Sequence, residues 1–257
     1  MKKLSFVHSY LKEIKNEQLF LLEFLEDEKK DFQDMIDFFD LMKIQSEKYK
    51  LKEILHIISQ ISNNHHRSID FFYKIQMILN YLQESIKKYF SNYDIFNIFH
   101  NNKRILLILF DEKILFPDKT LKSIITNGKY LKMHYPEYFY PEFEKLYETQ
   151  FIEQLDSKIV EMARTNIEIF LEKRKIGEND EYLCELIRND SINEFITFIN
   201  KSNISSSTII TPSIFETNLF LIKRDNLKVI EYSSFFGSIQ IIKYFLMNKA
   251  IISPTLF

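Results

Sequence analysis

Residues 230–246 read IEYSSFFGSIQIIKYFL, and this stretch decides the predicted fold. Two short apolar segments flank Gly237, one of only three glycines among the 257 residues. A glycine adopts the left-handed backbone conformation without a Cβ clash, so it can end one helix and let a second return beside it. The stretch therefore predicts two antiparallel helices joined by a tight turn.

The predicted second helix carries an apolar stripe, while the first helix carries two small residues, Ser233 and Ser234. The small side chains leave room for a neighbouring helix to approach closely. The stripe consists of Ile241, Ile242, Phe245 and Leu246. One hairpin cannot bury such a face alone, so the pattern predicts a stack of helix hairpins, the architecture of repeat proteins that bind other proteins.

These residues resemble the ankyrin repeat, whose pattern is roughly T-P-L-H-x-A-A-x-x-G-H-x-E-V-V-x-L-L-L-x-x-G-A. Two departures are that no Thr-Pro precedes the first helix and that Lys249 replaces the second glycine. The resemblance implies a protein-binding role, with no established activity to transfer. The matching positions are Ile230, Glu231, Ser233, Ser234, Gly237, Ser238, Ile241, Ile242, Tyr244, Phe245, Leu246 and Ala250.

A wider resemblance covers roughly residues 50 to 257. Several runs look like the large protist families of ankyrin-repeat proteins that carry a helical N-terminal region. The resemblance implies helical repeats after a helical region of unknown role. The matching runs are residues 61–67, 88–99, 177–180, 183–188 and 212–218.

A second hairpin is predicted over residues 182–199, because a shift of 47 positions brings it onto the first, with Asp190 at the position of Gly237. Its expected repeat positions are Leu183, Ile187, Asp190, Phe195, Phe198 and Ile199. The usual ankyrin spacing is about 33 residues, so the connection holds an insertion of about 14. We expect this insertion in the Ser/Thr-rich loop at residues 202–224.

The inserted loop is the predicted partner-contact region, since long loops on a rigid scaffold are frequent contact sites. The alternative for each of its side chains is that it packs back onto its own repeat. The candidate contact residues are Phe215, Glu216, Asn218, Phe220 and Arg224.

A third helix pair is predicted over residues 94–115, where a shift of 136 places Asn101 on Gly237. Asparagine tolerates the left-handed conformation better than most residues, so we expect Asn101 to close this turn. Other apolar periodicities predict further helices through residues 1–176. The expected fold is all-α, with a helical region at 1–176 followed by degenerate ankyrin-type repeats at 177–257.

Composition limits the possible functions. Apolar residues make up 46% of the chain and charged residues 27%, as in folded soluble domains. The net charge of −2 provides no broad field for nucleic acid. No apolar run is long enough to span a membrane, and the N-terminus lacks the apolar core of a signal peptide. The single cysteine, Cys184, excludes an internal disulfide, so an intracellular, cytoplasmic protein is expected.

No motif for catalysis, phosphate binding or metal binding is evident, so no cofactor is expected. The pair His65-His66 lacks further ligands at zinc spacing and is interpreted as a polar turn. We therefore expect a non-enzymatic protein-interaction scaffold; the alternatives are a structural tether and an enzyme with a site among the N-terminal helices. The chain ends at Phe257, where another outer helix would begin, so an apolar edge that favours self-association is also expected.

Overall fold

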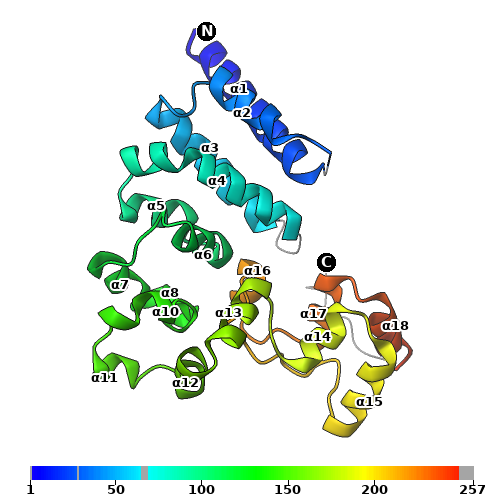
Figure 1. The fold of residues 1–257 in the computed structure, drawn as a ribbon. Helices are drawn as coiled ribbons and strands as arrows, with labels where there is room; N and C mark the ends of the chain where they lie inside the picture. Colours follow the sequence, from blue (N-terminus) through cyan, green and yellow to red (C-terminus); the bar gives the residue numbers. More distant parts are fainter. Residues whose placement is uncertain (1, 28, 65–68, 249–257) are drawn as a thin grey trace. The chain divides into compact units, whose positions relative to one another are not determined.

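The computed structural model describes residues 2–27, 29–64 and 69–248. Within these ranges the regular structure is helical, apart from one isolated antiparallel bridge between Ile209 and Lys228 (Figure 1). The all-α prediction is confirmed. The chain forms two compact units, one of residues 1–127 with 141–147 and the other of residues 128–140 with 148–257.

The first unit contains two layers of helices. α1 and α4 pack against each other, α1 also packs on α3, and the pairs α3–α5, α5–α7 and α4–α6 are in contact. α2 joins α4 through the stacked rings of Phe39 and Tyr81, 6.2 Å apart. The odd-numbered helices thus form one layer and the even-numbered helices the other. The helices are α1 (Lys2–Glu26), α2 (Phe32–Leu41), α3 (Lys48–Asn64), α4 (Ile69–Tyr89), α5 (Asn92–Phe99), α6 (Lys103–Asp111) and α7 (Lys119–Ile125).

The core of this unit follows from the 3.6-residue period of α3 and α4. The buried side chains of α3 recur at steps of three and four, which places them on the face toward α4 and α5. Full burial of each such side chain contributes roughly 1.5–3 kcal/mol of transfer free energy. The fully buried apolar positions of α3 are Leu51, Ile54, Leu55 and Ile58. Ser59 lies one position further, and its hydroxyl donates to the carbonyl of Ile98 in α5 at 2.8 Å.

The helix pair predicted over residues 94–115 is present as α5 and α6, but the prediction for its turn is wrong. Asn101 is not among the residues with positive φ. The turn is instead closed by Asn102, in extended geometry, whose side chain accepts from the nitrogen of Ile105 at 3.0 Å. An asparagine that caps the following helix makes a left-handed residue unnecessary here.

The second unit begins with short helical turns and continues through two longer hairpins. α12 packs on α13, α14 on α15, and α17 on α18. Residues 141–147 belong to the first unit and carry most of α10 (Tyr140–Phe143) and the short 3-10 helix η1 (Glu144–Leu146). The helices of the second unit are α8 (Gly128–Lys132), α9 (Tyr135–Tyr138), α11 (Thr149–Ile152), α12 (Ser157–Thr165), α13 (Ile167–Ile176), α14 (Tyr182–Arg188), α15 (Ile192–Ser202), α16 (Leu219–Ile222), α17 (Val229–Phe236) and α18 (Ile239–Met247).

The compact units do not divide at the boundary predicted between residues 176 and 177. α13 belongs to the same unit as the hairpins that follow it. Its Phe170 is fully buried and meets the ring of Phe215 edge-on at 5.4 Å. Its Arg174 is also buried and donates to the carbonyl of Tyr138 at 3.0 Å. The glycine and the charged residues near position 177 mark the end of α13. They do not mark a boundary between units, because α13 packs against residues on both sides of them in the sequence.

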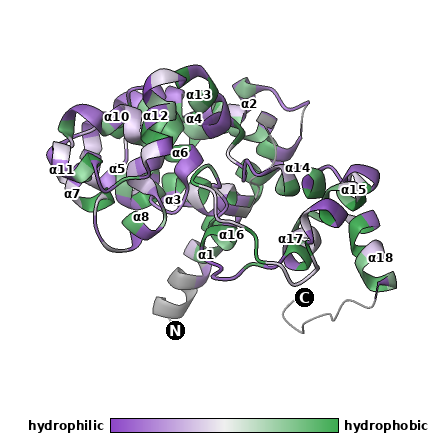
Figure 2. Ribbon diagram, turned by 90° about the horizontal axis from the view of Figure 1, so that it is seen from below, coloured by the Kyte–Doolittle hydropathy of each residue, from purple (hydrophilic) through white to green (hydrophobic). Residues whose placement is uncertain are grey.

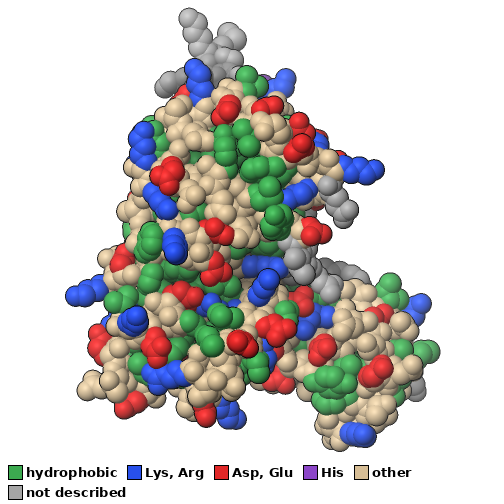
Figure 3. Space-filling model, in the orientation of Figure 1, with side chains coloured by type: hydrophobic (Ala, Val, Ile, Leu, Met, Phe, Trp, Pro, Cys, Tyr) green, Lys and Arg blue, Asp and Glu red, His purple; other side chains and the backbone are tan. Residues whose placement is uncertain are grey.

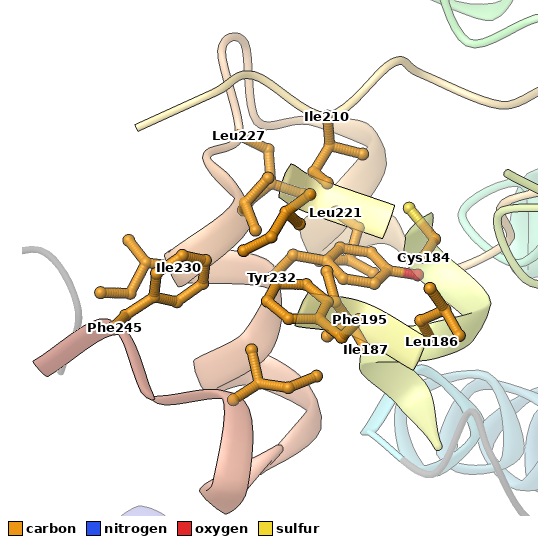
Figure 4. Close-up of a cluster of buried hydrophobic side chains, with 13 residues drawn as sticks. Cys184, Leu186, Ile187, Phe195, Ile210, Leu221, Leu227, Ile230, Tyr232 and Phe245 are labelled. Atoms are coloured by element: carbon orange, nitrogen blue, oxygen red, sulfur yellow. The ribbon is translucent and has the colours of Figure 1, made fainter. Parts of the chain in front are cut away.

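The two predicted C-terminal hairpins are present and stack on each other. A shift of 47 carries α14 onto α17 and α15 onto α18, and each helix packs against its counterpart. Asp190 and Gly237 occupy the same turn position, and both are left-handed, with φ of 49° and 67°. One apolar cluster joins the hairpins, and in Figure 4 the ring of Tyr232 reaches from α17 to Cys184 on α14. The left-handed turn predicted at Gly237 is therefore confirmed, and Asp190 adopts the same conformation at the equivalent position.

Candidate binding surfaces

The predicted repeat positions divide into core and surface. Ser233 is fully buried and its hydroxyl donates to the carbonyl of Val229 at 2.8 Å, which keeps the small side chain inside the helix pair. Ser234 makes the same bond to Ile230 at 2.9 Å but is only half-buried. Ala250 and Lys249 lie outside the described residues. The positions in or against the cluster are Leu183, Ile187, Phe195, Phe198, Ile199, Ile230, Ile241 and Phe245.

A polar network holds the segment before α14 against both hairpins. Arg188 is largely buried; its Nη1 donates to the carbonyl of Asn179 at 2.7 Å and to the hydroxyl of Tyr232 at 2.9 Å. Its Nε lies 2.6 Å from a carboxylate oxygen of Glu178. Burial raises the pKa of Cys184 to about 12, so this thiol is neutral and unreactive at pH 7. The network is structural, because its donors and acceptors satisfy one another.

The inserted loop is folded back onto its own unit at its middle. Phe215 is 1% exposed, and Glu216 and Asn218 are also buried. The Glu216 carboxylate accepts from the nitrogens of Asn179 at 3.3 Å and Asn218 at 2.8 Å. The prediction that these three side chains lie at a contact surface is therefore wrong: the loop uses them to fill the space beside residues 177–179 and α13.

Two candidate contact residues of the loop do reach the surface. Phe220 is 50% exposed and stacks on Phe235 at 5.4 Å. The guanidinium of Arg224 lies 4.6 Å from the Phe220 ring and 3.4 Å from the carboxylate of Glu231. Both side chains are thus held in place by α17. Their contact with a partner stays a prediction.

The outer face of α18 exposes apolar side chains at positions that are covered in the preceding hairpin. Phe195 and Ile199 are buried, and Phe195 meets the ring of Phe245 at 5.5 Å. Their counterparts 47 positions later, Ile242 and Leu246, are half-buried and 44% exposed. Figure 2 shows the hydrophobic residues on α18. α18 covers the equivalent face of α15, but no helix of the described residues covers this face of α18.

The first unit carries a groove that the sequence did not reveal. It runs between α1 and α3 and encloses about 610 Å³, with an adjoining hollow of about 410 Å³ between α3 and α5. Tyr49, Lys52 and His56 line both hollows, so they form a ridge between them. The apolar side chains of the larger hollow are Ile14, Leu22, Ile57 and Ile61. We call these two hollows and their ridge the α3 groove.

The carboxylates of the α3 groove accept hydrogen bonds from this chain, whereas its lysines form no ion pairs with described residues. Glu53 accepts a hydrogen bond from the hydroxyl of Tyr10 at 2.7 Å. Asp94 accepts from the nitrogen and hydroxyl of Ser91, which lowers the pKa of Asp94; the positive charges of Lys48 and Lys52 lower it further. Neither lysine forms an ion pair within the described part of the chain.

The only signal for this groove in the sequence is the polar face of α3. Tyr49, Lys52 and His56 recur at steps of three and four, opposite the buried stripe. Burial lowers the pKa of His56, and Lys52 lowers it further, so this imidazole is neutral at pH 7. Tyr49 is 87% exposed, the most exposed large hydrophobic side chain among the described residues.

Other chemistry finds little support in the described residues. No group of three or more His, Cys, Asp or Glu side chains there could hold a metal ion. The pair His65-His66 lies outside the described residues. Positive and negative side chains are interspersed on the face that Figure 3 shows, with no extended basic patch. No described helix is both long and apolar enough to cross a membrane.

Comparison with known proteins found no matching family model, no significantly similar curated protein and no significantly similar solved structure.

Proposed function

We propose that this chain is a non-enzymatic scaffold that binds other proteins through stacked helix hairpins, with degenerate ankyrin-type repeats in its second unit. The observation that supports this most is the order of packing: α14 contacts α17 and α15 contacts α18, as in a solenoid. In the first unit, α3–α5 and α4–α6 follow the same order. Stacked hairpins of this kind present a preformed surface, which loses little conformational entropy when a partner binds.

The α3 groove is the proposed partner site. It combines an apolar floor with a few polar groups, the composition typical of preformed binding sites, and its larger hollow lies within their usual range of about 300–1,000 Å³. A tyrosine on the ridge of such a groove often contributes strongly to binding energy, since its rigid ring buries a large area at low entropic cost. Tyr49 would be the main contact.

A photo-cross-linking experiment tests this function in the native cell. The photoreactive analogue p-benzoylphenylalanine replaces either Tyr49 in the α3 groove or Tyr73, which is 61% exposed on α4 of the other layer. After irradiation, cross-linked proteins are identified by mass spectrometry. We expect one reproducible protein from position 49 that is missing from position 73. The absence of any cross-link from position 49, or the same set from both positions, would refute the site.

A second proposed contact is self-association through the α18 face, with Leu246 and Met247, which is 77% exposed, as its centre. Light scattering at increasing protein concentration tests it. We expect the mean mass to rise with concentration in the wild type and to stay at the monomer value in the variant Leu246→Lys with Met247→Lys. A wild-type chain that stays monomeric at high concentration contradicts this contact.

One observation favours an enzyme as the second candidate. Lys52, Glu53 and His56 line a single hollow, so three ionisable groups converge there. Against it, no hydrogen bond joins them among the described residues, and Glu53 is already engaged by Tyr10. A general base needs a partner within about 3 Å, directly or through a water molecule. The binding function therefore remains the better supported proposal.

A further inference from the structure

We infer that the α3 groove takes an amphipathic helix from another protein, with an apolar face on the groove floor and carboxylates along one flank. This inference rests on the proposed function and names the class of its partner. It is carried by the juxtaposition of an apolar floor and two lysines, Lys48 and Lys52, that form no ion pair within the described part of this chain.

The floor favours a helix over an extended peptide. Its apolar lining includes Ile14, Leu22 and Ile57, whose side chains offer no hydrogen bonds to a backbone. An extended segment would bury unsatisfied N–H and C=O groups there, whereas a helix satisfies its own. The α3 part of the floor runs from Tyr49 to Ile61. At 1.5 Å per residue this is about 18 Å, which matches a partner helix of about three turns.

The lysines favour acidic residues on that helix. Lys48 and Lys52 are four positions apart on α3, so their side chains emerge one turn, about 6 Å, from each other. Carboxylates four residues apart on a partner helix have the same spacing. The two carboxylates of the groove, Glu53 and Asp94, already accept hydrogen bonds from Tyr10 and Ser91 and do not neutralise the lysines by direct contact.

A second copy of this chain does not provide such a helix from its described acidic segment. α2 carries Asp34, Asp37 and Asp40 on its exposed side. Its apolar side chains Met35 and Phe39 are fully buried in its own unit, so α2 cannot offer an apolar face while folded. This excludes α2 of a second copy as the occupant, which we assign to a different protein.

A phage-displayed library of random 16-residue peptides tests the inference without a known partner. The library is selected on the full-length protein, and synthetic copies of the enriched peptides are measured by fluorescence anisotropy. We expect sequences with Asp or Glu four residues apart and apolar residues at helical spacing. Their binding should weaken about tenfold or more in Lys48→Glu with Lys52→Glu, and it should also weaken as salt rises.

The matched control reverses the same amount of charge elsewhere in the first unit. Lys87 and Lys88 are both exposed at the end of α4, and Lys87→Glu with Lys88→Glu should leave peptide binding within about twofold. Circular dichroism establishes that both variants are folded. No enrichment, enriched peptides without acidic residues, or equal weakening in both variants overturns the inference.

The two proposals fail separately. If cross-linking from position 49 captures a protein but the selected peptides are not acidic helices, the scaffold function stands and the partner class is wrong. If peptides bind as expected but self-association also depends on Lys48 and Lys52, the occupant is a second copy instead. A groove that yields neither cross-links nor peptides refutes both.

Discussion

The carboxylate of Asp190 accepts a hydrogen bond from the backbone nitrogen of Gln240 at 3.0 Å, across 50 residues of sequence. Its other oxygen accepts from the nitrogen of Ile241 at 3.1 Å. Asp190 thus forms the left-handed turn that follows α14, and its side chain also caps α18 in the next hairpin. Ser238, in the usual capping position of α18, instead donates to the carbonyl of Ile187 at 2.5 Å.

Asp190→Ala should therefore destabilise the second unit. It removes the cap of α18 and places alanine at φ 49°, and a lost cap alone costs about 1 kcal/mol. Asp190→Asn should cost less, because asparagine tolerates the left-handed region and keeps one acceptor. Urea denaturation followed by circular dichroism measures both. The control, Glu172→Ala on the exposed side of α13, should change little, and an Asp190→Ala variant as stable as this control would contradict the role of the cap.

Gly237→Val should destabilise the terminal hairpin by at least about 1 kcal/mol, because valine at φ 67° is strained. No atom lies within 4 Å of a Cβ built at this glycine, so backbone strain is the main cause. Gly177→Ala provides a contrast, since a Cβ there would meet Thr217 Oγ1 at 3.1 Å in addition to the strain at φ 70°. Thermal melting should rank Gly237→Asn above Gly237→Val, and equal melting temperatures for wild type and Gly237→Val would refute the assignment.

Arg188→Met should cost the second unit about 2–4 kcal/mol, because it removes the donors that Arg188 supplies to Glu178 and to the carbonyl of Asn179. Tyr232→Phe, which removes one hydrogen bond of the same network, should cost about 1 kcal/mol. The alkylation rate of Cys184 provides the measurement, since this thiol is 1% exposed and reacts only after opening. If Arg188→Met leaves the rate at the wild-type value, the network is not stabilising.

The helices and the turn at Gly237 were predictable because their causes are local. The steps of three and four between apolar residues mark α3 and α17 directly, and glycine at position 237 specifies its own backbone geometry. The cap from Asp190 to α18 was not predictable, since any of several acidic residues could serve and only the stacking selects one. The same limit applies to Phe215, whose loop looks exposed in sequence until α13 is placed beside it.

The α3 groove shows this limit most clearly. In the sequence, its ridge residues form only the polar face of a helix, and such a face usually contacts solvent and no partner. What makes it a candidate site is the distance between α1 and α3, which depends on how the two helices pack. The prediction for Asn101 was wrong for a related reason. The side chain of Asn102 caps the following helix and replaces the left-handed turn that the internal shift of 136 residues suggested.

Glu17 should make the stability of the first unit depend on pH. It is 3% exposed on α1, and its Oε2 has no hydrogen-bond partner among the described residues. Burial, reinforced by the negative charges of Glu53 and Glu13, raises the pKa of Glu17 from 4.5 to about 7, while Lys50 opposes the shift. The folded state therefore favours the protonated form.

The sign of the effect follows from linkage. Because the pKa is higher in the folded than in the unfolded state, the contribution of Glu17 to stability is complete below pH 4.5 and is lost as pH rises through 7. A loss of about 1–3 kcal/mol is expected between pH 4.5 and 8. Glu17→Gln, which is neutral throughout, should be more stable than wild type at pH 8 and nearly equal at pH 4.5. Urea denaturation at the two pH values decides it, and an identical pH dependence in both proteins would show that Glu17 is ionised in the folded state without cost.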